Sequence, residues 1–299
     1  MNDHPQVLLI DGMSLLVRSA KAGAKMMPLS HQGVSTNTLV TFTGTLVRHL
    51  RLAPWDYVLV SWEGEPELNW RRKLYPEYKS GRPVHRDDAP LMSIDQELAM
   101  GFCDAAGLYQ SWQSDMEGDD ILAEAWRLFR GLGSQPYMTI VTEDRDLLQL
   151  TEPGTVWRAW STDVTTAGDV LETYMVPPAR LALLRALAGD ASDEIPGIKG
   201  IGPVTAANMI DEKLTDMENI SSYVVKLGIE PMFQVMTWWL ISDLRSPVMR
   251  PRLGTAGELS ESTAWHPEEH LGELLGFLKS YGMNRLMIRV ESGDTPWAN

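Results

Sequence analysis

The chain has 299 residues, 44% of them hydrophobic, which is enough to bury a sizeable core in one large domain or two smaller ones. Its 26 basic and 40 acidic residues give a net charge of −14, which argues against a uniformly basic surface for nucleic acid. The single cysteine excludes an internal disulfide framework, and no run approaches the about 20 apolar residues of a membrane span. Residues 1–6 do not resemble a signal peptide, so we expect a cytoplasmic protein without a membrane partner.

Short apolar runs predict buried parallel strands at residues 7–10, 57–62 and 138–142, with a helix at 37–50 between the first two. A strand, a helix and a second strand form a βαβ unit, which predicts a parallel sheet. Further strands are expected at 108–112 and 155–160 and a helix at 92–107. The carboxylates that follow the first three strands are Asp11, Glu63, Glu143, Asp144 and Asp146. Because the carboxyl ends of parallel strands meet at one sheet edge, we expect these groups to converge there.

Three more carboxylates, Glu117, Asp119 and Asp120, precede the helical pattern of residues 121–129. One interpretation is a helix start, in which Ser114 and Glu117 form a capping box and the acids favour the positive end of the helix. The other is a divalent metal site, because carboxylates that are crowded together repel unless they are protonated, paired or bound to a cation. The acids at the other strand ends favour the metal site.

Residues 63–90 are rich in proline and in charged and aromatic side chains, so we expect no core element there. The spacing of Tyr75 from Lys79 and of Tyr78 from Arg82 predicts a short helix that presents rings and cations together. Such a surface suits nucleic acid, with cations for phosphates and rings for bases. A solvated loop with incidental charge is the alternative. The basic residues of the segment are Arg71, Arg72, Lys73, Lys79, Arg82 and Arg86.

From residue 177 onward the pattern is helical. A helix at 180–188 is followed by Asp190 and Asp193 and then by a glycine-rich turn before a helix at 204–210. Gly197, Gly200 and Gly202 permit a tight turn whose amides, with the start of the next helix, form a phosphate-binding site. This pattern is that of a helix-hairpin-helix, a binder of nucleic-acid backbone, although a purely structural turn remains the alternative.

Five segments together resemble the flap endonuclease family, in particular the 5′-nuclease domain of bacterial DNA polymerase I and its free-standing bacteriophage counterparts. The resemblance runs from about residue 7 to about residue 210. The segments are Leu9-Ile10-Asp11-Gly12, Leu74-Tyr75-Pro76-Glu77-Tyr78-Lys79, Glu117-Gly118-Asp119-Asp120, Asp144-Arg145-Asp146-Leu147-Leu148-Gln149-Leu150 and Gly189-Asp190-Ala191-Ser192-Asp193.

The resemblance implies an α/β fold: a mainly parallel central sheet flanked by helices, of the PIN and flap-endonuclease type, with a helical helix-hairpin-helix region. We expect a nuclease domain at 1–176 with an arch at 63–95, and a helical region at 177–299 with the hairpin motif at about 185–211. It also implies a structure-specific 5′-nuclease of DNA replication or repair that acts on 5′ ends, flaps or branches, and also on RNA primers in RNA–DNA hybrids. We expect a monomer in a bacterial cell, or in host cytoplasm if phage-encoded.

The resemblance assigns roles to individual residues. Two or more Mg²⁺ or Mn²⁺ ions would activate water and stabilise the leaving oxygen, and K⁺ is expected at the hairpin. The metal positions are Asp11, Glu63, Glu117, Asp119, Asp120, Asp144, Asp146, Asp190 and Asp193. The catalytic group comprises Lys79, Arg82, Asp11, Asp119 and Asp144. The expected DNA contacts are Arg71, Arg72, Tyr75, Tyr78, Lys79, Arg82, Gly197, Lys199, Gly200, Gly202 and Thr205.

Two positions depart from the family pattern. Glu63 stands where the family has aspartate, and Glu143 stands where it has glycine, which adds a negative charge beside the site. We expect activity to survive both changes, with an altered metal preference. A phosphatase of the haloacid dehalogenase type is set aside, because Met13 replaces its second aspartate. A non-catalytic DNA-binding scaffold and a PIN-type ribonuclease remain the alternatives.

Overall fold

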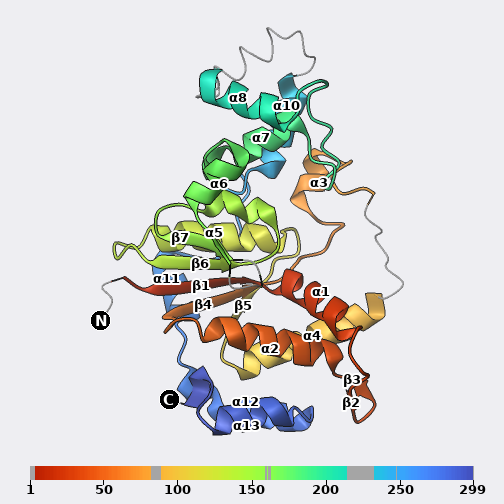
Figure 1. Ribbon diagram of the computed structural model, residues 1–299, viewed down its shortest axis with the longest axis vertical. Helices are drawn as coiled ribbons and strands as arrows, with labels where there is room; N and C mark the ends of the chain where they lie inside the picture. The colour runs from red at the N-terminus through yellow and green to blue at the C-terminus, as the bar shows by residue number, and fades with distance from the viewer. Residues whose placement is uncertain are drawn as a thin grey trace.

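The computed structural model describes residues 4–81, 89–158, 160, 163–213, 232–246 and 248–298. Its centre is a six-stranded sheet in the order β5-β4-β1-β6-β7-β8 (Figure 1). All neighbouring strands run parallel except β8, which is antiparallel to β7. The strands are β1 (Gln6–Asp11), β4 (Tyr57–Ser61), β5 (Tyr109–Ser111), β6 (Tyr137–Val141), β7 (Thr155–Arg158) and β8 (Val164–Thr165). A separate hairpin pairs β2 (Ser30–His31) with β3 (Val34–Ser35).

Alternate residues of each strand point to opposite sides of the sheet, and both of its faces are buried. Leu8 and Ile10 of β1 pack into one hydrophobic cluster, whereas Val7 and Leu9 pack into another. The helices on the face of Val7 and Leu9 include α5 (Gly118–Arg130) and α11 (Ala256–Thr263). The helices of the opposite face are α1 (Gly12–Gly23), α2 (Asn37–Leu50), α4 (Ala89–Ala105), α12 (Leu271–Ser280) and α13 (Asn284–Glu291).

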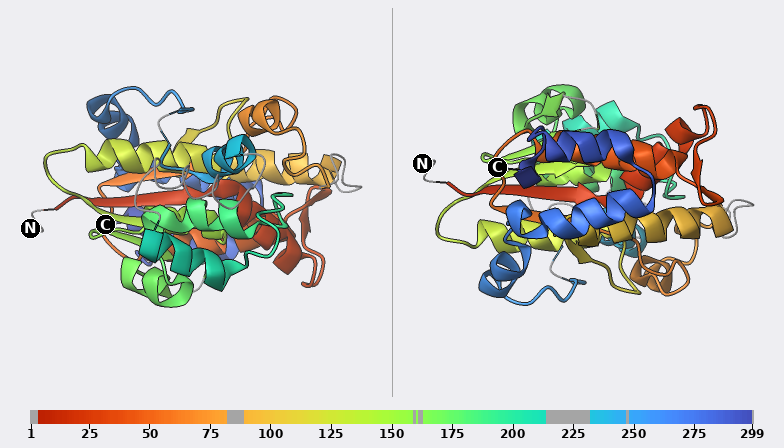
Figure 2. Two further views of the ribbon diagram at one scale, coloured as in Figure 1. Left: turned by 90° about the horizontal axis from the view of Figure 1, so that it is seen from above. Right: turned by 90° about the horizontal axis from the view of Figure 1, so that it is seen from below.

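A group of helices lies above the strands at the top of Figure 1 and nearest the viewer in the left view of Figure 2. Helix α7 packs against both α8 and α10, and α10 also contacts α3. These helices are α3 (Trp70–Leu74), α6 (Ala167–Tyr174), α7 (Leu181–Ala188), α8 (Pro203–Lys213) and α10 (Met232–Ser242). The last helices of the chain return to the sheet, and the right view of Figure 2 shows them beside α4. The division of the chain near residue 177 stays a prediction.

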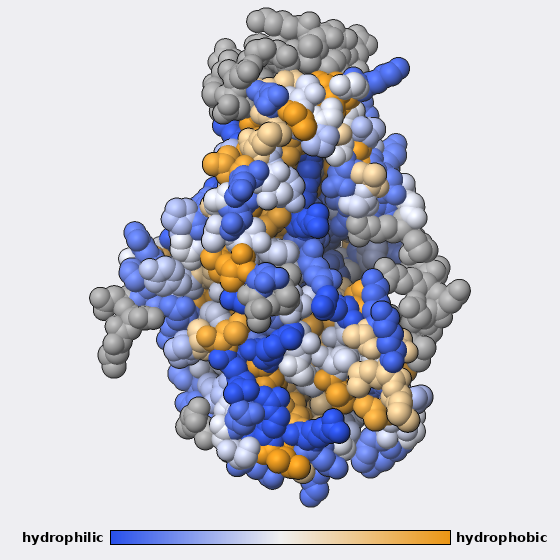
Figure 3. All heavy atoms as spheres, viewed as in Figure 1, coloured by the Kyte–Doolittle hydropathy of each residue, from blue (hydrophilic) through white to orange (hydrophobic). Residues whose placement is uncertain are grey.

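Four short 3₁₀ segments complete the described elements: η1 (Arg145–Leu150), η2 (Pro178–Arg180), η3 (Pro267–His270) and η4 (Pro296–Ala298). Within the described ranges, no helix is long and apolar enough to cross a membrane. On the face that Figure 3 shows, hydrophilic side chains gather along the middle of the molecule, with apolar ones scattered among them.

The segment at 63–81 differs most from its prediction. The expected helix through Tyr75 to Arg82 is wrong, because the described part, up to residue 81, forms turns after α3 ends at Leu74. Pro76 explains the early end, since it disfavours helical backbone at the residue before it. The expectation that no core element lies here is also wrong, because Trp70 and Tyr78 are 4% and 3% exposed and belong to the core.

Candidate active site

Asp11 anchors the site at the carboxyl end of the central strand β1. It caps α1, because Oδ1 accepts a hydrogen bond from the Ser14 amide at 2.9 Å, while Oδ2 accepts one from the Thr142 hydroxyl at 2.7 Å. Burial raises the pKa of Asp11, although both hydrogen bonds oppose the rise. Next to it, Gly12 leaves no room for a side chain, since an added Cβ would lie 2.7 Å from the Ser61 carbonyl oxygen. The start of α1 therefore lies directly against β4.

The amino end of α5 brings three further carboxylates to the same edge. The Glu117 amide donates to Oδ2 of Asp120 at 3.0 Å, so Asp120, rather than Ser114, completes the capping arrangement with Glu117. Asp119 is 9% exposed, and its Oδ1 is buried with no hydrogen-bond partner among the described residues. Burial raises the pKa of Asp119 well above its usual range, although the Arg71 charge opposes the rise. Oδ1 of Asp119 therefore has no hydrogen-bond donor among the described residues, and Nη2 of Arg71 lies 3.8 Å from it as an ion-pair partner.

Arg71 lies beneath these acids. Its Nη1 and Nη2 donate to the two carboxylate oxygens of Asp120 at 2.7 and 2.8 Å, and its Nε donates to the Ile241 carbonyl at 2.8 Å. The residue is 2% exposed. The expected DNA contact by Arg71 is therefore wrong, because the guanidinium is buried and already occupied. The expected metal position at Asp120 needs the same correction, since Arg71 takes both of its oxygens.

Glu117 collects the donors of the 63–81 segment. The Tyr78 hydroxyl donates to Oε2 at 3.0 Å, and Nζ of Lys79 lies 2.9 and 2.8 Å from the two carboxylate oxygens. Burial opposes the charge of Glu117, but Arg71 and Lys79 lower the pKa of its carboxyl to about 2. The expected stacking of Tyr78 on bases is wrong for this structure, because the ring is buried and its hydroxyl holds Glu117. Lys79, by contrast, reaches the carboxylates, and its catalytic role stays a prediction.

The second half of the site lies between β6 and α7. Asp144 caps η1 by accepting from the Asp146 amide at 2.8 Å, and Asp146 makes a close ion pair with Arg185 of α7. Asp190 accepts from the amide and hydroxyl of Ser192 at 2.8 and 2.6 Å. These hydrogen bonds and Arg185 lower the pKa of Asp190, although partial burial opposes them.

Asp193 links the two halves, because its Oδ1 lies 4.0 Å from Nζ of Lys79. Burial raises the pKa of Asp193 to about 6 despite Lys79. Glu63 and Asp144 are exposed as whole residues, yet desolvation of their carboxyl groups and then like charges raise the pKa of both. The like charges come chiefly from Glu117 for Glu63 and from Asp146 for Asp144.

The donor set of the site suits a hard divalent cation, because it consists of carboxylates, and Asp119 offers a buried oxygen without a hydrogen bond. Within the described residues, however, no three acidic, histidine or cysteine groups already converge as a metal site. The structure instead shows the acids paired with bases, with Lys79 on Glu117 and Arg185 on Asp146. The carboxylates have the chemistry of ligands for a divalent metal. In this structure they are neutralised by Lys79 and Arg185 instead of by a metal ion.

Both departures from the family pattern have a local explanation. Glu143 forms an exposed ion pair with Arg18 of α1, which compensates its extra negative charge. Glu63 uses its length to reach α5, because a Cβ added at Gly118 would lie 3.6 Å from its Oε1. No sequence pattern pointed to Arg18 or Arg185, since neither belongs to an acidic or glycine-rich motif.

The predicted hairpin joins α7 to α8. The Ile198 amide donates to the Leu187 carbonyl at 2.8 Å, and Gly197 packs so closely on Gly189 that an added Cβ would lie 2.3 Å from its nitrogen. Gly200 has a φ of +86°. The hairpin residues at its outer surface are Lys199, Gly200, Gly202 and Thr205, which are all exposed.

The remaining predicted DNA contacts are less accessible or undescribed. Arg72 is partly buried and donates to the Lys79 carbonyl at 3.1 Å, while the Tyr75 hydroxyl donates to the Glu194 carbonyl at 3.0 Å. Arg82 and Arg86 lie outside the described residues.

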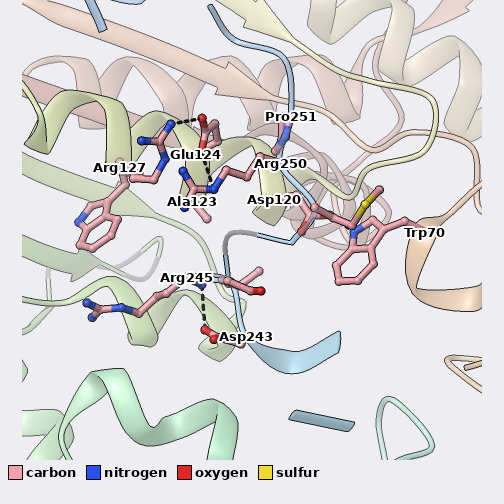
Figure 4. Close-up of a pocket in the computed structure, with 13 residues that line it drawn as sticks. Trp70, Asp120, Ala123, Glu124, Arg127, Asp243, Arg245, Arg250 and Pro251 are labelled. Carbon is pink, nitrogen blue, oxygen red and sulfur yellow. Dashed lines mark hydrogen bonds and ion pairs between the residues drawn. The ribbon is translucent and has the colours of Figure 1, made fainter. Parts of the chain in front are cut away.

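Behind Asp120 and Trp70 lies a small pocket that is lined by α5 and by residues 243–246 and 249–251 (Figure 4). Nε of Arg127 donates to Oε2 of Glu124 at 2.7 Å, and Nε of Arg250 lies 4.0 Å from the same oxygen. Glu124 therefore already pairs with two arginines in this pocket, which Asp120 also lines.

Comparison with known proteins places this geometry in a family. Residues 6–175 match the family described as "5′-3′ exonuclease, N-terminal resolvase-like domain". The chain is 32% identical to a 5′-3′ exonuclease of Bacillus subtilis, over 74% of this chain and 75% of that protein. It is 36% identical to DNA polymerase I of Deinococcus radiodurans over 69% of this chain, but spans only 21% of that protein. The T5 D15 protein, co-crystallised with metal ions, shares the fold at 16% identity with a TM-score of 0.67, over 90% of this chain and 99% of that one. The chain belongs to the 5′-3′ exonuclease family.

Proposed function

We propose that the protein is a metal-dependent 5′-nuclease that hydrolyses phosphodiester bonds in DNA with 5′ ends, flaps or branches. The observation that carries the proposal is the carboxylate row at one sheet edge, from Asp11 to Asp119 and Glu117, with Lys79 reaching into it. The names of relatives support it, since they include 5′-3′ exonucleases and a flap endonuclease Xni of Shewanella.

We assign the metal-ligand role to the predicted carboxylates other than Asp120. These are Asp11, Glu63, Glu117, Asp119, Asp144, Asp146, Asp190 and Asp193, some of them acting through water. Mg²⁺ or Mn²⁺ fits them, because hard ions prefer oxygen ligands. Such ions would supply Lewis-acid activation of water and stabilise the charge on the phosphoryl oxygens. Asp120 and Arg71 would fix the orientation of α5 rather than touch substrate.

Lys79 would act on the phosphate itself. Its ammonium lies 4.0 Å from Asp193 and is hydrogen-bonded to Glu117, so it stands between the two halves of the acid cluster. Burial opposes its charge, but Glu117 and Asp193 raise its pKa, so Lys79 remains a cation at neutral pH. A fixed cation at this place would stabilise the negative charge that develops during phosphoryl transfer. Arg82, three residues further on, is proposed to assist it.

DNA would be held away from the site by the exposed hairpin of Lys199, Gly200, Gly202 and Thr205. Its amides and the start of α8 form a phosphate-binding arrangement, and K⁺ is proposed there as a bridge to the backbone. RNA–DNA hybrids are a proposed second substrate, and we expect a monomer. A cytoplasmic location is proposed because these relatives come from bacteria, where DNA lies in the cytoplasm.

A substrate panel tests the proposal. The wild-type chain would be incubated with 5′-end-labelled flap duplex, blunt duplex, single-stranded DNA and single-stranded RNA, each with Mg²⁺, Mn²⁺ or chelator. We expect metal-dependent products near the flap junction or from the 5′ end of duplex DNA. Binding of flap DNA without any cleavage would favour the DNA-binding scaffold, and cleavage of single-stranded RNA alone would favour the PIN-type ribonuclease.

A further inference from the structure

Arg185 of α7 lies inside the half of the acid cluster that Asp146 and Asp190 form. Its Nη1 makes a close ion pair with Oδ1 of Asp146, and its Nε lies 3.7 Å from Oδ2 of Asp190. Its side chain is only 18% exposed, so these charges are largely shielded from water. Burial opposes the charge of the guanidinium, but Asp146 and Asp190 raise its pKa. A permanent positive charge therefore stands between these two carboxylates.

We propose, on the basis of the metal-dependent function proposed above, that Arg185 is an internal counter-ion that competes with divalent cations for Asp146 and Asp190. A cation that approaches these oxygens meets a fixed like charge, and it must displace the guanidinium to gain full access to Asp146. In a shielded site this repulsion is much stronger than in bulk water. Arg185 thus lowers the metal affinity of this half of the site.

Lys79 and Arg185 differ in the structure of the segments that carry them. Lys79 belongs to a segment of turns and has a φ of +52°, whereas Arg185 projects from α7, which packs against α8 and α10. Arg185 therefore lies on a packed helix, so the guanidinium would leave Asp146 by a movement of its side chain. A DNA phosphate is a suitable alternative acceptor, because guanidinium binds phosphate and carboxylate with similar geometry. Binding of DNA would then release the carboxylates and strengthen metal binding.

Removal of Arg185 should have different effects if it is a competing counter-ion and if its role is purely structural. Without Arg185, Asp146 and Asp190 repel each other in the metal-free protein, so that form becomes less stable. The same change leaves the carboxylates more attractive to a cation. A structural arginine would lower both stability and metal affinity, whereas the counter-ion role predicts opposite signs.

The experiment is a calorimetric titration of the full chain with Mn²⁺ alone, together with thermal unfolding in chelator and in Mn²⁺. The variants are Arg185→Gln, Arg185→Lys and the control Arg285→Gln, which removes an exposed charge of α13 far from the site. We expect Arg185→Gln to bind at least one Mn²⁺ about tenfold more tightly than wild type. It should also have a lower Tm in chelator and a larger rise in Tm with Mn²⁺. Arg285→Gln should match wild type.

Arg185→Lys keeps the charge but loses the fork that reaches two carboxylates, so we expect Mn²⁺ binding about threefold tighter than wild type. If Arg185→Gln does not fold, the Arg185→Lys variant tests the inference instead. In that case, an Mn²⁺ affinity of Arg185→Lys equal to that of wild type would overturn the inference. Equal or weaker Mn²⁺ binding by folded Arg185→Gln also overturns it and leaves the nuclease proposal standing. No Mn²⁺ binding by wild type or either Arg185 variant would overturn both.

Discussion

Arg71 and Asp120 form a two-point ion pair, in which Nη1 and Nη2 of the arginine donate to the two carboxylate oxygens at 2.7 and 2.8 Å. The pair joins α3 to the amino end of α5, and the Nε of Arg71 extends the connection to α10 through the Ile241 carbonyl. The helix that presents Glu117 and Asp119 is therefore held from below by a buried cation. The position of α5 therefore depends on Arg71, a buried residue that does not face the substrate.

Arg71→Met should destabilise the protein strongly. Removing one partner of a buried pair leaves the other charge without compensation, which costs about 3–5 kcal/mol of unfolding free energy. Chemical denaturation of wild type and variant measures the loss, and Arg72→Met, a change at the partly exposed neighbour, should cost less than about 1 kcal/mol. A loss for Arg71→Met no larger than that of the control would show that the pair does not hold α5.

Gly12→Ala should disturb the site, while Gly44→Ala should not. An added Cβ at Gly12 would meet the Ser61 carbonyl oxygen at 2.7 Å, whereas no atom lies within 4 Å of one added at Gly44 of α2. We expect Gly12→Ala to cost about 1–3 kcal/mol through overpacking, and Gly44→Ala to gain about 0.5–1 kcal/mol through helix propensity. Thermal unfolding of both variants checks the signs. Equal stability of the two would contradict the close approach of α1 to β4.

His49 should make the protein less stable in mild acid. The residue is 2% exposed, and burial followed by the charges of Arg48 and Arg158 lowers its pKa to about 4. The unfolded chain therefore takes up a proton near pH 6.5 that the folded chain refuses until about pH 4. The stability contributed by neutral His49 is complete above pH 6.5 and is lost as the pH falls through this window, by about 3 kcal/mol.

Denaturation at several pH values tests this effect with His49→Phe, which cannot titrate. The difference in unfolding free energy between wild type and variant should move in favour of the variant as the pH falls from about 6.5 to 4. A difference that is constant across this range would show that His49 titrates normally in the folded protein.

Lys79→Met should slow catalysis more than it weakens DNA binding. The ammonium lies within the carboxylate cluster, so its loss removes charge stabilisation from the reacting phosphate and costs about 100-fold or more in kcat. Lys199→Met at the exposed hairpin should instead weaken DNA binding and leave the single-turnover rate at saturation nearly unchanged. Single-turnover cleavage at increasing protein concentration separates the two effects. Identical behaviour of both variants would contradict the separate roles of cluster and hairpin.

The sheet and the acid cluster could be predicted because both follow from local patterns. Strands that are buried on both faces are continuously apolar, so the apolar runs that end at Asp11 and Glu63 predicted parallel strands. The parallel pairing of β1 with β4 confirms this prediction. The α2 prediction matches the helix found, because its apolar stripe faces the sheet. Helix α1 was missed because its residues carry no strong start signal beyond Asp11 itself.

The supporting bases could not be predicted, because their partners are distant in sequence. Arg71 belongs to a basic run that reads as a DNA-binding surface, and only tertiary packing turns it inward toward Asp120, 49 positions away. Tyr78 was misassigned for the same reason, since its hydroxyl meets Glu117 across the fold. Sequence patterns identify acids that need compensation, but they do not show which base supplies it.

The most direct test of the central claim is single-turnover cleavage of a 5′-labelled flap duplex in Mg²⁺ by wild type and Asp119→Asn. Asp119 has a buried oxygen without a hydrogen-bond partner among the described residues, so it is assigned to metal rather than to structure. Asp243→Asn, at a partly buried aspartate outside the cluster, is the matched control. The account predicts Mg²⁺-dependent cleavage by wild type and control and a loss of about 100-fold or more in Asp119→Asn. Cleavage that is independent of metal, or undiminished in folded Asp119→Asn, would contradict it.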